Sequence, residues 1–345
     1  MKQEKQQYEF SGRVLRDMSS AVLVLDTKGS IVYVNRPASK ILEIDEGSEV
    51  RPFDSLIDND YNDGFSDAVL DALYDRDEVT RRRVRFMAAS GKKYVLLMTS
   101  SYLKAEEEGE DRLVITISDL TEMEQIREKF TDSSMTFSTF LFAFCGWMLV
   151  YALWEFLKRP IAADFMTHGV EVMGLIMLIF IIRSTSLTWK DLGIGNDEPG
   201  KTVKTALIVA FCAVLFLALL KAGIRLFDPT AFEPDAPFFD ISRFGIRQII
   251  YIFTAGIQEF LARSVMQGNL RRISPSKHRG LYAILLSSFI FAALHIHFGF
   301  LFMIGSAILA GLEGILYDKQ NSLLGVWIVH WAFGVGATLL CLIDH

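Results

Sequence analysis

About seven apolar segments, each close to the length that crosses a bilayer, constrain the fold of this chain more than any other feature. A transmembrane helix needs about 20 predominantly apolar residues. Segments of that kind follow one another through the last two thirds of the chain, at 135–157, 165–184, 202–227, 244–270, 280–297, 299–317 and 322–342. The pattern predicts an all-α polytopic membrane bundle of about seven transmembrane helices.

The first part of the chain has a different composition. Residues 1 to about 130 are charge-rich, whereas all three Cys, all six His and all five Trp come after residue 133. Such a break predicts three parts: a soluble domain at 1–120, a linker helix at 121–132 and a membrane domain at 133–345. The cysteines fall inside apolar segments, so we expect small buried side chains and neither disulfides nor a metal pair.

Charge in the loops predicts how the helices cross the membrane. The N-terminal residues lack the apolar core of a signal peptide, so we expect the first domain to stay in the cytosol. The largest outer loop, 228–240, then has four acidic and no basic residues, as the positive-inside rule requires. The expectation is a multi-pass protein of the cell membrane, embedded in the lipid bilayer with a cytosolic N-terminus. The net charge of −6 gives no reason to expect nucleic acid as a partner.

Four ionisable or polar residues stand out in the apolar second half: Glu259, Arg263, His295 and His330. A charged side chain in the bilayer costs a few kcal/mol or more, and it usually faces a bundle interior or a water-filled cavity. Glu259 and Arg263 are four residues apart and therefore lie on one helix face, where they can pair. We expect all four to meet in one polar cavity of the bundle.

Their order resembles a known family. Glu259-x-x-x-Arg263, Phe291-x-x-x-His295 and a lone histidine in the final helix resemble the CPBP or CAAX-protease family of intramembrane endopeptidases, also described as type II CAAX prenyl endopeptidase-like. The segment from Trp189 to Gly193 resembles a stretch common before that family's third span. The resemblance implies peptide-bond hydrolysis within the membrane, acting on a membrane protein or peptide. It also implies roles: a water-holding group at His295, a structural Glu259–Arg263 pair and an oxyanion donor at His330.

The chain departs from the family pattern at two positions. Gln258 stands where the resemblance implies the catalytic base, and an amide cannot accept a proton at neutral pH. Gly334 stands at the second oxyanion position and has no side chain. Gln258 is either natural or a substitution that traps an inactive state. Glu313 is the candidate substitute base, because burial would raise the pKa of a carboxyl; the alternative is a structural partner for a neighbouring cation.

A metal is a further implication of the resemblance, since the family is often called a metalloprotease. A divalent ion such as Zn would use His295 and His330. The neighbouring His297 could share it only where the helix ends, because residues two apart on a helix face different ways. His295 also falls near the outer end of its segment. Either the fifth span begins deeper, or residues 296–300 form a turn that lines a cavity.

The N-terminal part resembles a PAS domain, an α+β fold with an antiparallel sheet and helices. Residues 21–25 and 31–34 predict two strands around an Asp26–Gly29 turn, and Asn35 predicts a helix N-cap. Further strands are expected at 79–86, 93–103 and 113–117. The Asp119-Leu-Thr121 segment matches the exit through which many PAS domains pass into a signalling helix.

The PAS ligand is left unassigned by the sequence. Without Cys or His, residues 1–130 lack the groups for a flavin adduct or a histidine-ligated haem. We expect a module that forms a homodimer and relays a signal, with a small-molecule sensor as the alternative. The basic strand with Arg81, Arg82, Arg83 and Arg85 is either a solvated face or a contact for anionic lipid.

Two functional hypotheses of different classes follow. The first is a PAS-regulated CPBP-type intramembrane endopeptidase, weakened by the amide at Gln258. The second is a pseudoprotease, a membrane sensor or scaffold that binds a transmembrane partner in the former substrate cavity. A solute carrier is less consistent with the sequence, which has no internal repeat of spans.

Overall fold

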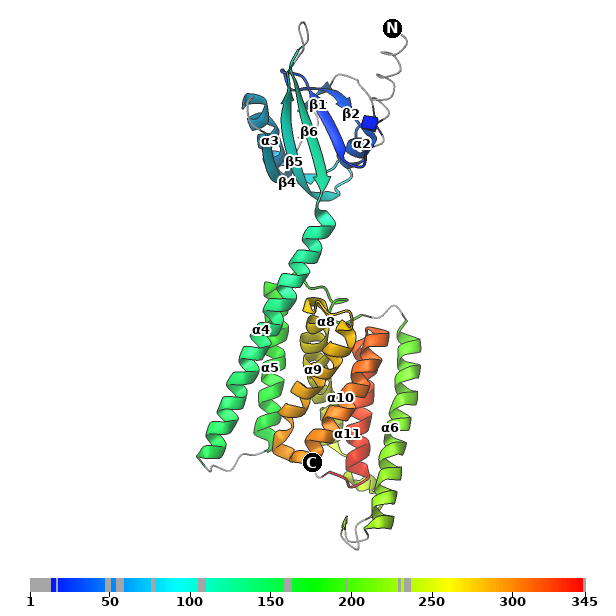
Figure 1. Cartoon of the computed structure of the whole chain (residues 1–345). Helices are drawn as coiled ribbons and strands as arrows, with labels where there is room; N and C mark the ends of the chain where they lie inside the picture. Colours follow the sequence, from blue (N-terminus) through cyan, green and yellow to red (C-terminus); the bar gives the residue numbers. More distant parts are fainter. Residues whose placement is uncertain are drawn as a thin grey trace. The chain divides into compact units, whose positions relative to one another are not determined.

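The computed structural model divides the chain into two compact units, Met1–Arg127 and Glu128–His345 (Figure 1). The boundary falls inside helix α4 (Thr121–Phe156). Each unit is described by itself. The structure describes residues 14–16, 18–46, 51–53, 59–75, 79–104, 110–157, 163–195, 198–228, 231–232 and 237–343.

The first unit is built on an antiparallel sheet with strand order β3-β2-β1-β6-β5-β4. The first strand, β1, and the last, β6, pair in the middle of the sheet, with Ala21 opposite Ile117. Between β3 and β4 the chain forms a short 3-10 turn, η2, and helix α3. The bounds are β1 (Ala21–Leu25), β2 (Ser30–Val34), α2 (Arg36–Leu42), β3 (Arg51–Pro52), η2 (Asp60–Asn62), α3 (Asp63–Tyr74), β4 (Thr80–Met87), β5 (Lys93–Leu103) and β6 (Arg112–Asp119).

Local hydrogen bonds explain why this unit starts as the sequence predicts. The Asp26 carboxylate accepts from the backbone N–H of Lys28 at 2.9 Å and of Ser30 at 2.7 Å, which closes the β1–β2 turn. The Asn35 side chain caps α2 by accepting from Ala38 N, and it also accepts from Val22 N at 2.8 Å. One buried amide therefore ties the first strand to the first helix.

Alternate residues of the strands form the hydrophobic core of the first unit. Leu23, Leu96 and Ile115 are fully buried, and Phe65 of α3 packs over them on the same face. The strand order, the antiparallel register and the helices inserted between β2 and β4 are those expected of a PAS fold. The prediction of an antiparallel α+β unit is confirmed.

The second unit is mostly helical. Its elements are the remainder of α4, α5 (Ala163–Ser184), α6 (Pro199–Phe227), η4 (Ile241–Arg243), α7 (Ile246–Glu259), η5 (Phe260–Gly268), α8 (Asn269–Ile273), α9 (Arg279–Leu294), η6 (Ile296–Phe298), α10 (Phe300–Gln320) and α11 (Leu323–Leu339). Among the described residues, four continuous helices are long and apolar enough to cross a membrane: α4, α6, α7 through α8, and α10. The apolar helices α9 and α11 are shorter.

The outer surfaces of these helices are apolar. In α6, for example, Phe211 is 69% exposed and Leu219 is 64% exposed, and on α10 Leu301 is 85% exposed. A soluble protein rarely exposes such continuous apolar surface, whereas a helix in lipid requires it. Inside the unit, α11 packs against both α6 and α7, and α9 packs against α10 (Figure 1). This second unit is therefore a helical membrane domain.

The chain turns sharply between α9 and α10. α9 ends at Leu294 with His295 at its C-cap, and one 3-10 turn follows before Gly299 adopts a φ of 97°. Only glycine adopts such a φ without strain, so the turn is fixed at this point. The sequence left two explanations for the position of His295, a deeper fifth span or a turn after it. The structure has the turn, at 296–299.

Candidate active site

A π-helical segment positions the central charged residues. The helix that begins at Ile246 changes from α to π geometry over η5, Phe260–Gly268, before it returns to α geometry in α8. A π segment is rare, and it often marks a functional site because it reorients side chains within a continuous helix. Every residue of η5 is buried. Arg263 lies inside this segment, and Glu259 lies directly before it.

Arg263 is fully buried and is the cation at the centre of the site. Its Nε donates to Glu259 Oε2 at 2.8 Å, the pair expected from their spacing of four residues. A second nitrogen donates to Gln267 Oε1 at 3.0 Å, and the third lies 3.4 Å from Glu313 Oε2. The guanidinium thus joins η5 to α10, and none of its nitrogens faces lipid.

His330 enters the same cluster from α11. Its Nδ1 donates to Glu259 Oε1 at 2.7 Å and lies 3.6 Å from Glu313 Oε2. Both oxygens of Glu259 are therefore used, one by Arg263 and one by His330. Glu259 therefore contacts both Arg263 and His330. That these side chains line one shared cavity stays a prediction.

Glu313 completes the cluster from α10. The side chain is 1% exposed, and its Oε1 has no hydrogen-bond partner among the residues that the structure describes. Buried carboxylate oxygens are normally paired, because an unpaired one costs the full desolvation penalty. Glu313 therefore provides an open acceptor beside His330. Its contact with Arg263 also matches the alternative interpretation, a structural partner for a cation.

His295 lies next to this cluster and outside its hydrogen bonds. Its Nδ1 donates to the Phe291 carbonyl at 2.9 Å, and its ring also stacks on Phe298 and Phe302. The Phe291 ring centroid is 4.6 Å from that of His295 and 5.9 Å from that of His330. The two histidines are thus within about 12 Å, our limit for water-bridged action in one cavity.

The two positions that depart from the family pattern behave differently. Gln258 is half-buried on α7, one residue before Glu259. At Gly334 a β-carbon would lie 2.8 Å from the Tyr251 hydroxyl oxygen and closer still to its ring. The space for a side chain at 334 is therefore occupied by Tyr251. Sequence reasoning did not select this tyrosine, although it precedes Gln258 by two helical turns on the same face.

The Glu259–Glu313–His330 group does not fit a resident divalent metal ion. Glu259, Glu313 and His330 do offer ligand atoms within 4.8 Å of one another. However, Arg263 already supplies a cation between the two carboxylates, and His330 Nδ1 is held by Glu259. A metal would have to break these hydrogen bonds and would lie against a permanent positive charge. The expected pair, His295 and His330, would have to bind a metal through Nε2, because Nδ1 of each is hydrogen-bonded, to the Phe291 carbonyl and to Glu259. The His297 side chain lies outside the described residues.

A loop between α5 and α6 connects the cluster to the start of the helical unit. Lys129 of α4 donates to Asp191 Oδ1 at 3.0 Å. In the next residues of the loop, Leu192 O accepts from Ser264 Oγ at 2.6 Å, and Gly193 O accepts from Leu323 N at 2.9 Å. Ser264 follows Arg263 in η5, and Leu323 begins the helix that carries His330. Three consecutive loop residues thus contact α4, η5 and α11.

Asp191 is the charged member of this loop, which lies outside the apolar helices. Partial burial of the carboxyl opposes ionisation. The hydrogen bonds from Thr188 and the ammonium of Lys129 outweigh it and hold the pKa of Asp191 below its ordinary value. Arg272 donates to the Asp191 carbonyl at 2.9 Å and to Ser133 Oγ at 2.8 Å, which fixes α8 to the same loop and to α4.

The end of the first unit is also anchored by side chains. The Asp119 carboxylate accepts from Thr121 N at 2.8 Å, and Thr121 Oγ1 accepts from Val95 N at 3.0 Å. Arg83 on β4 pairs with Glu124 at 2.6 Å, and Arg82 pairs with Asp71 at 2.5 Å. Two of the four arginines on this strand therefore have acidic partners within the unit, the pattern of a solvated face.

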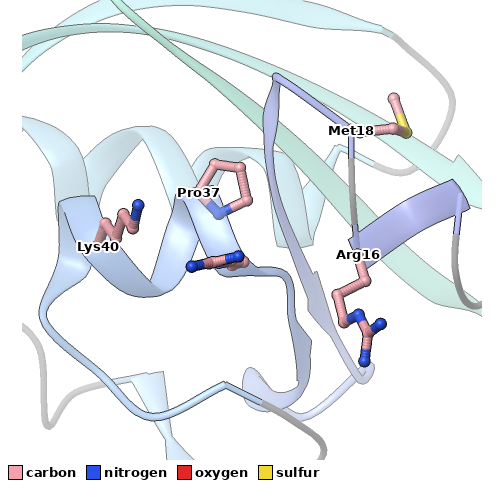
Figure 2. Close-up of a pocket in the computed structure, with 5 residues that line it drawn as sticks. Arg16, Met18, Pro37 and Lys40 are labelled. Carbon is pink, nitrogen blue, oxygen red and sulfur yellow. The ribbon is translucent and has the colours of Figure 1, made fainter.

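A basic recess of about 410 Å³ lies on the first unit (Figure 2). Arg36 in this recess is exposed, and its Nε lies 3.7 Å from Glu46 Oε1. The recess is separate from the space between the sheet and α3, where Phe65, Phe86 and Met98 fill the interior of the described structure. It is thus a surface feature. Its lining residues are Arg16, Met18, Arg36, Pro37 and Lys40.

A bundle of apolar helices around a buried charged cluster defines the second unit as a membrane domain with a polar site. Residues 243–335 match the family described as type II CAAX prenyl endopeptidase Rce1-like. This range contains every residue of the cluster, together with Tyr251, His295 and Gly334. Within the second unit, residues 243–335 are thus similar to an Rce1-like CAAX protease domain, and the same chain has a first unit with PAS-like topology.

Solved structures similar to part of the chain are PAS and LOV domains. A PAS domain from a two-component sensor histidine kinase is 13% identical, covers 34% of this chain and 98% of its own, and has a TM-score of 0.27. A PAS domain of an HTR-like protein from Haloarcula marismortui is 22% identical with the same coverage and TM-score. The Rhodobacter sphaeroides LOV protein is 15% identical, with coverages of 39% and 79% and a TM-score of 0.29. No curated protein sequence matches the chain.

Proposed function

We propose that this protein is a PAS-regulated intramembrane endopeptidase of the CPBP type, with Glu313 as its general base. The observation that carries this proposal is the open Oε1 of Glu313, buried beside His330 in the charged cluster. Glu259 is less suited to this role because both of its oxygens are already bound. The proposed substrate is a peptide bond in a membrane protein or lipid-anchored peptide.

In this mechanism Glu313 takes a proton from a water molecule, and the water oxygen bonds to the peptide carbonyl carbon. The carbon–nitrogen bond then breaks, and the proton passes from Glu313 to the leaving amine. Arg263 holds Glu259 and Glu313 in place, and the buried setting strengthens every electrostatic contact. The amide of Gln258 can hold the water by hydrogen bonds without accepting its proton.

A cleavage assay on the purified full-length chain in bilayers tests this proposal. The substrates are a farnesylated CAAX peptide and an apolar transmembrane peptide. We expect slow turnover by the parent chain, loss of that turnover in Glu313→Gln, and a smaller fall in Gln258→Ala, which removes only hydrogen bonds to the water. Gln258→Glu added to Glu313→Gln should raise the rate by about 10²-fold or more, because it places a carboxylate where the base was lost and general-base catalysis contributes about 10²–10⁴-fold. Glu128→Gln, an exposed change on α4, is the matched control.

The second candidate is a pseudoprotease that binds a transmembrane partner in the same cavity. Gln258 at the expected base position is the observation that favours it. Absence of turnover in both the parent chain and Gln258→Glu would support this candidate and reject the peptidase. Turnover that survives Glu313→Gln would leave the peptidase standing and remove Glu313 as its base.

A further inference from the structure

Tyr251 occupies a space that the last helix leaves open. Gly334 has no side chain, and a β-carbon placed there would lie 2.8 Å from both Cζ and Oη of Tyr251. Real β-carbons essentially never approach another heavy atom so closely, so any other residue at 334 would displace the tyrosine. The glycine and the tyrosine are therefore a matched pair across α7 and α11.

The phenol is also directed toward the charged cluster. His330 precedes Gly334 by one helical turn, and its ring centroid is 6.1 Å from that of Tyr251. On α7, Tyr251 precedes Gln258 by two turns and shares its face. The Tyr251 ring thus lies beside the cluster's histidine and on the helix face that carries Gln258.

Two tryptophans hold the helices together on either side of the phenol. Trp331 Nε1 donates to the Gln248 carbonyl at 2.9 Å, and Trp327 Nε1 donates to the Ile252 carbonyl at 2.5 Å. Both acceptors lie on α7, one before and one after Tyr251. A polar group fixed in this way before substrate binds needs no reorganisation during the reaction, which is the requirement for electrostatic catalysis.

We propose that Tyr251 provides the second hydrogen-bond donor of this site, in the place that a side chain at position 334 would otherwise fill. Its hydroxyl donates to the carbonyl oxygen of the peptide bond as negative charge develops there. His330 donates to the same oxygen through Nε2–H in its doubly protonated form, because its Nδ1 already donates to Glu259. This inference rests on the proposed peptidase function. Gly334 is then the feature that makes room for a donor from a neighbouring helix.

The test compares Tyr251→Phe, which removes only the hydroxyl, with a swap variant, Tyr251→Ala with Gly334→Asn. The swap moves a donor from α7 to α11 into the same space. In the Gln258→Glu background, Tyr251→Phe should lower kcat about 10²-fold with KM nearly unchanged, since one oxyanion donor contributes about 10²–10³ in kcat. The swap variant should have a kcat at least 10-fold higher than that of Tyr251→Ala alone. Tyr282→Phe removes a hydroxyl from an exposed tyrosine on α9 and is the matched control.

A second measurement separates this inference from the peptidase proposal. A peptidyl phosphinate mimics the tetrahedral oxyanion, and the corresponding amide peptide does not. Tyr251→Phe should weaken phosphinate binding at least 10-fold and leave amide binding unchanged, even where no variant hydrolyses peptide. Equal kcat in Tyr251→Phe and its parent, or equal phosphinate affinity, would overturn the role of Tyr251. Failure of every variant to cleave would overturn the peptidase proposal and would not bear on the phosphinate result.

Discussion

Arg263 determines whether the buried charges of the site are tolerable. Two carboxylates, Glu259 and Glu313, lie with it in the apolar bundle, and each is at most 1% exposed. A buried ion pair adds little net stability over apolar packing, but removal of one partner leaves an uncompensated buried charge. The chain therefore needs Arg263 for folding even if the residue never touches a substrate.

Replacement of Arg263 by methionine should destabilise the helical unit by about 3–5 kcal/mol. All five tryptophans lie in this unit, so their fluorescence during denaturant unfolding of the full-length protein reports on it alone. Arg271→Met removes an exposed arginine that pairs with Asp318, and it should cost at most about 1 kcal/mol. Equal effects of the two changes would show that Arg263 is not the essential counter-ion.

Much of the cluster could be predicted from single residues, because charge in an apolar segment is costly and spacing fixes helix faces. Glu259, Arg263 and His330 were selected on these grounds. Tyr251 was missed because a tyrosine in an apolar helix is ordinary core material. Gly334 alone indicates only a missing side chain. That Tyr251 fills its space depends on how α7 approaches α11, which no local pattern encodes.

At the scale of elements, the loop between α5 and α6 connects α4 to the π-helical segment η5. Ser264 in η5 donates to Leu192 O, and the neighbouring Asp191 binds Lys129 of α4. A shift of α4 would therefore reach the segment that holds Arg263 through one short loop. These contacts form a continuous physical route between α4 and η5.

Asp191→Asn should lower the unfolding temperature of the helical unit at neutral pH. The pKa of Asp191 is lower in the folded protein than its ordinary value, so the folded state binds fewer protons. Its contribution to stability is then complete above about pH 4 and is lost as the pH falls through the lowered pKa. The difference between variant and parent in tryptophan fluorescence melts should shrink below about pH 4. Asp67→Asn, an exposed change on α3, should show no difference at any pH; a constant Asp191 effect from pH 7 to pH 3 would contradict the ionic role.

Element positions were largely predictable, and element geometry was not. The apolar segments are helical where the sequence indicates, yet α9 stops at Leu294, three residues before the predicted end at 297. Helix ends depend on capping, and here His295 and Gly299 end the helix and form the turn. No periodicity in the sequence marks the change to π geometry over Phe260–Gly268. The segment packs against α9 and α10, which are contacts that a local sequence pattern does not specify.

The whole molecule joins two units through one helix, α4, whose start is fixed by Asp119 and Thr121. Within residues 121–132 of this helix, three large apolar residues are exposed: Met123 at 69%, Ile126 at 60% and Phe130 at 50%. Their spacing of three and four residues is the repeat with which helices pair in a coiled coil. A second copy of the same stripe would cover these side chains, which supports the homodimer that we propose for this chain.

Ile126→Lys should therefore weaken dimer formation of the full-length protein in bilayers. A lysine at the centre of a paired apolar stripe would bury a charge against its own symmetry mate, and like charges at short range repel. We expect cross-linking through a cysteine introduced at position 123 to fall at least tenfold. Leu103→Lys, which changes a residue 63% exposed at the end of β5, should leave cross-linking intact.

If peptidase activity falls with cross-linking in Ile126→Lys and neither falls in Leu103→Lys, dimerisation through α4 regulates the site. Unchanged cross-linking in Ile126→Lys would reject the stripe as an interface and leave the first unit as a sensor that acts within one chain.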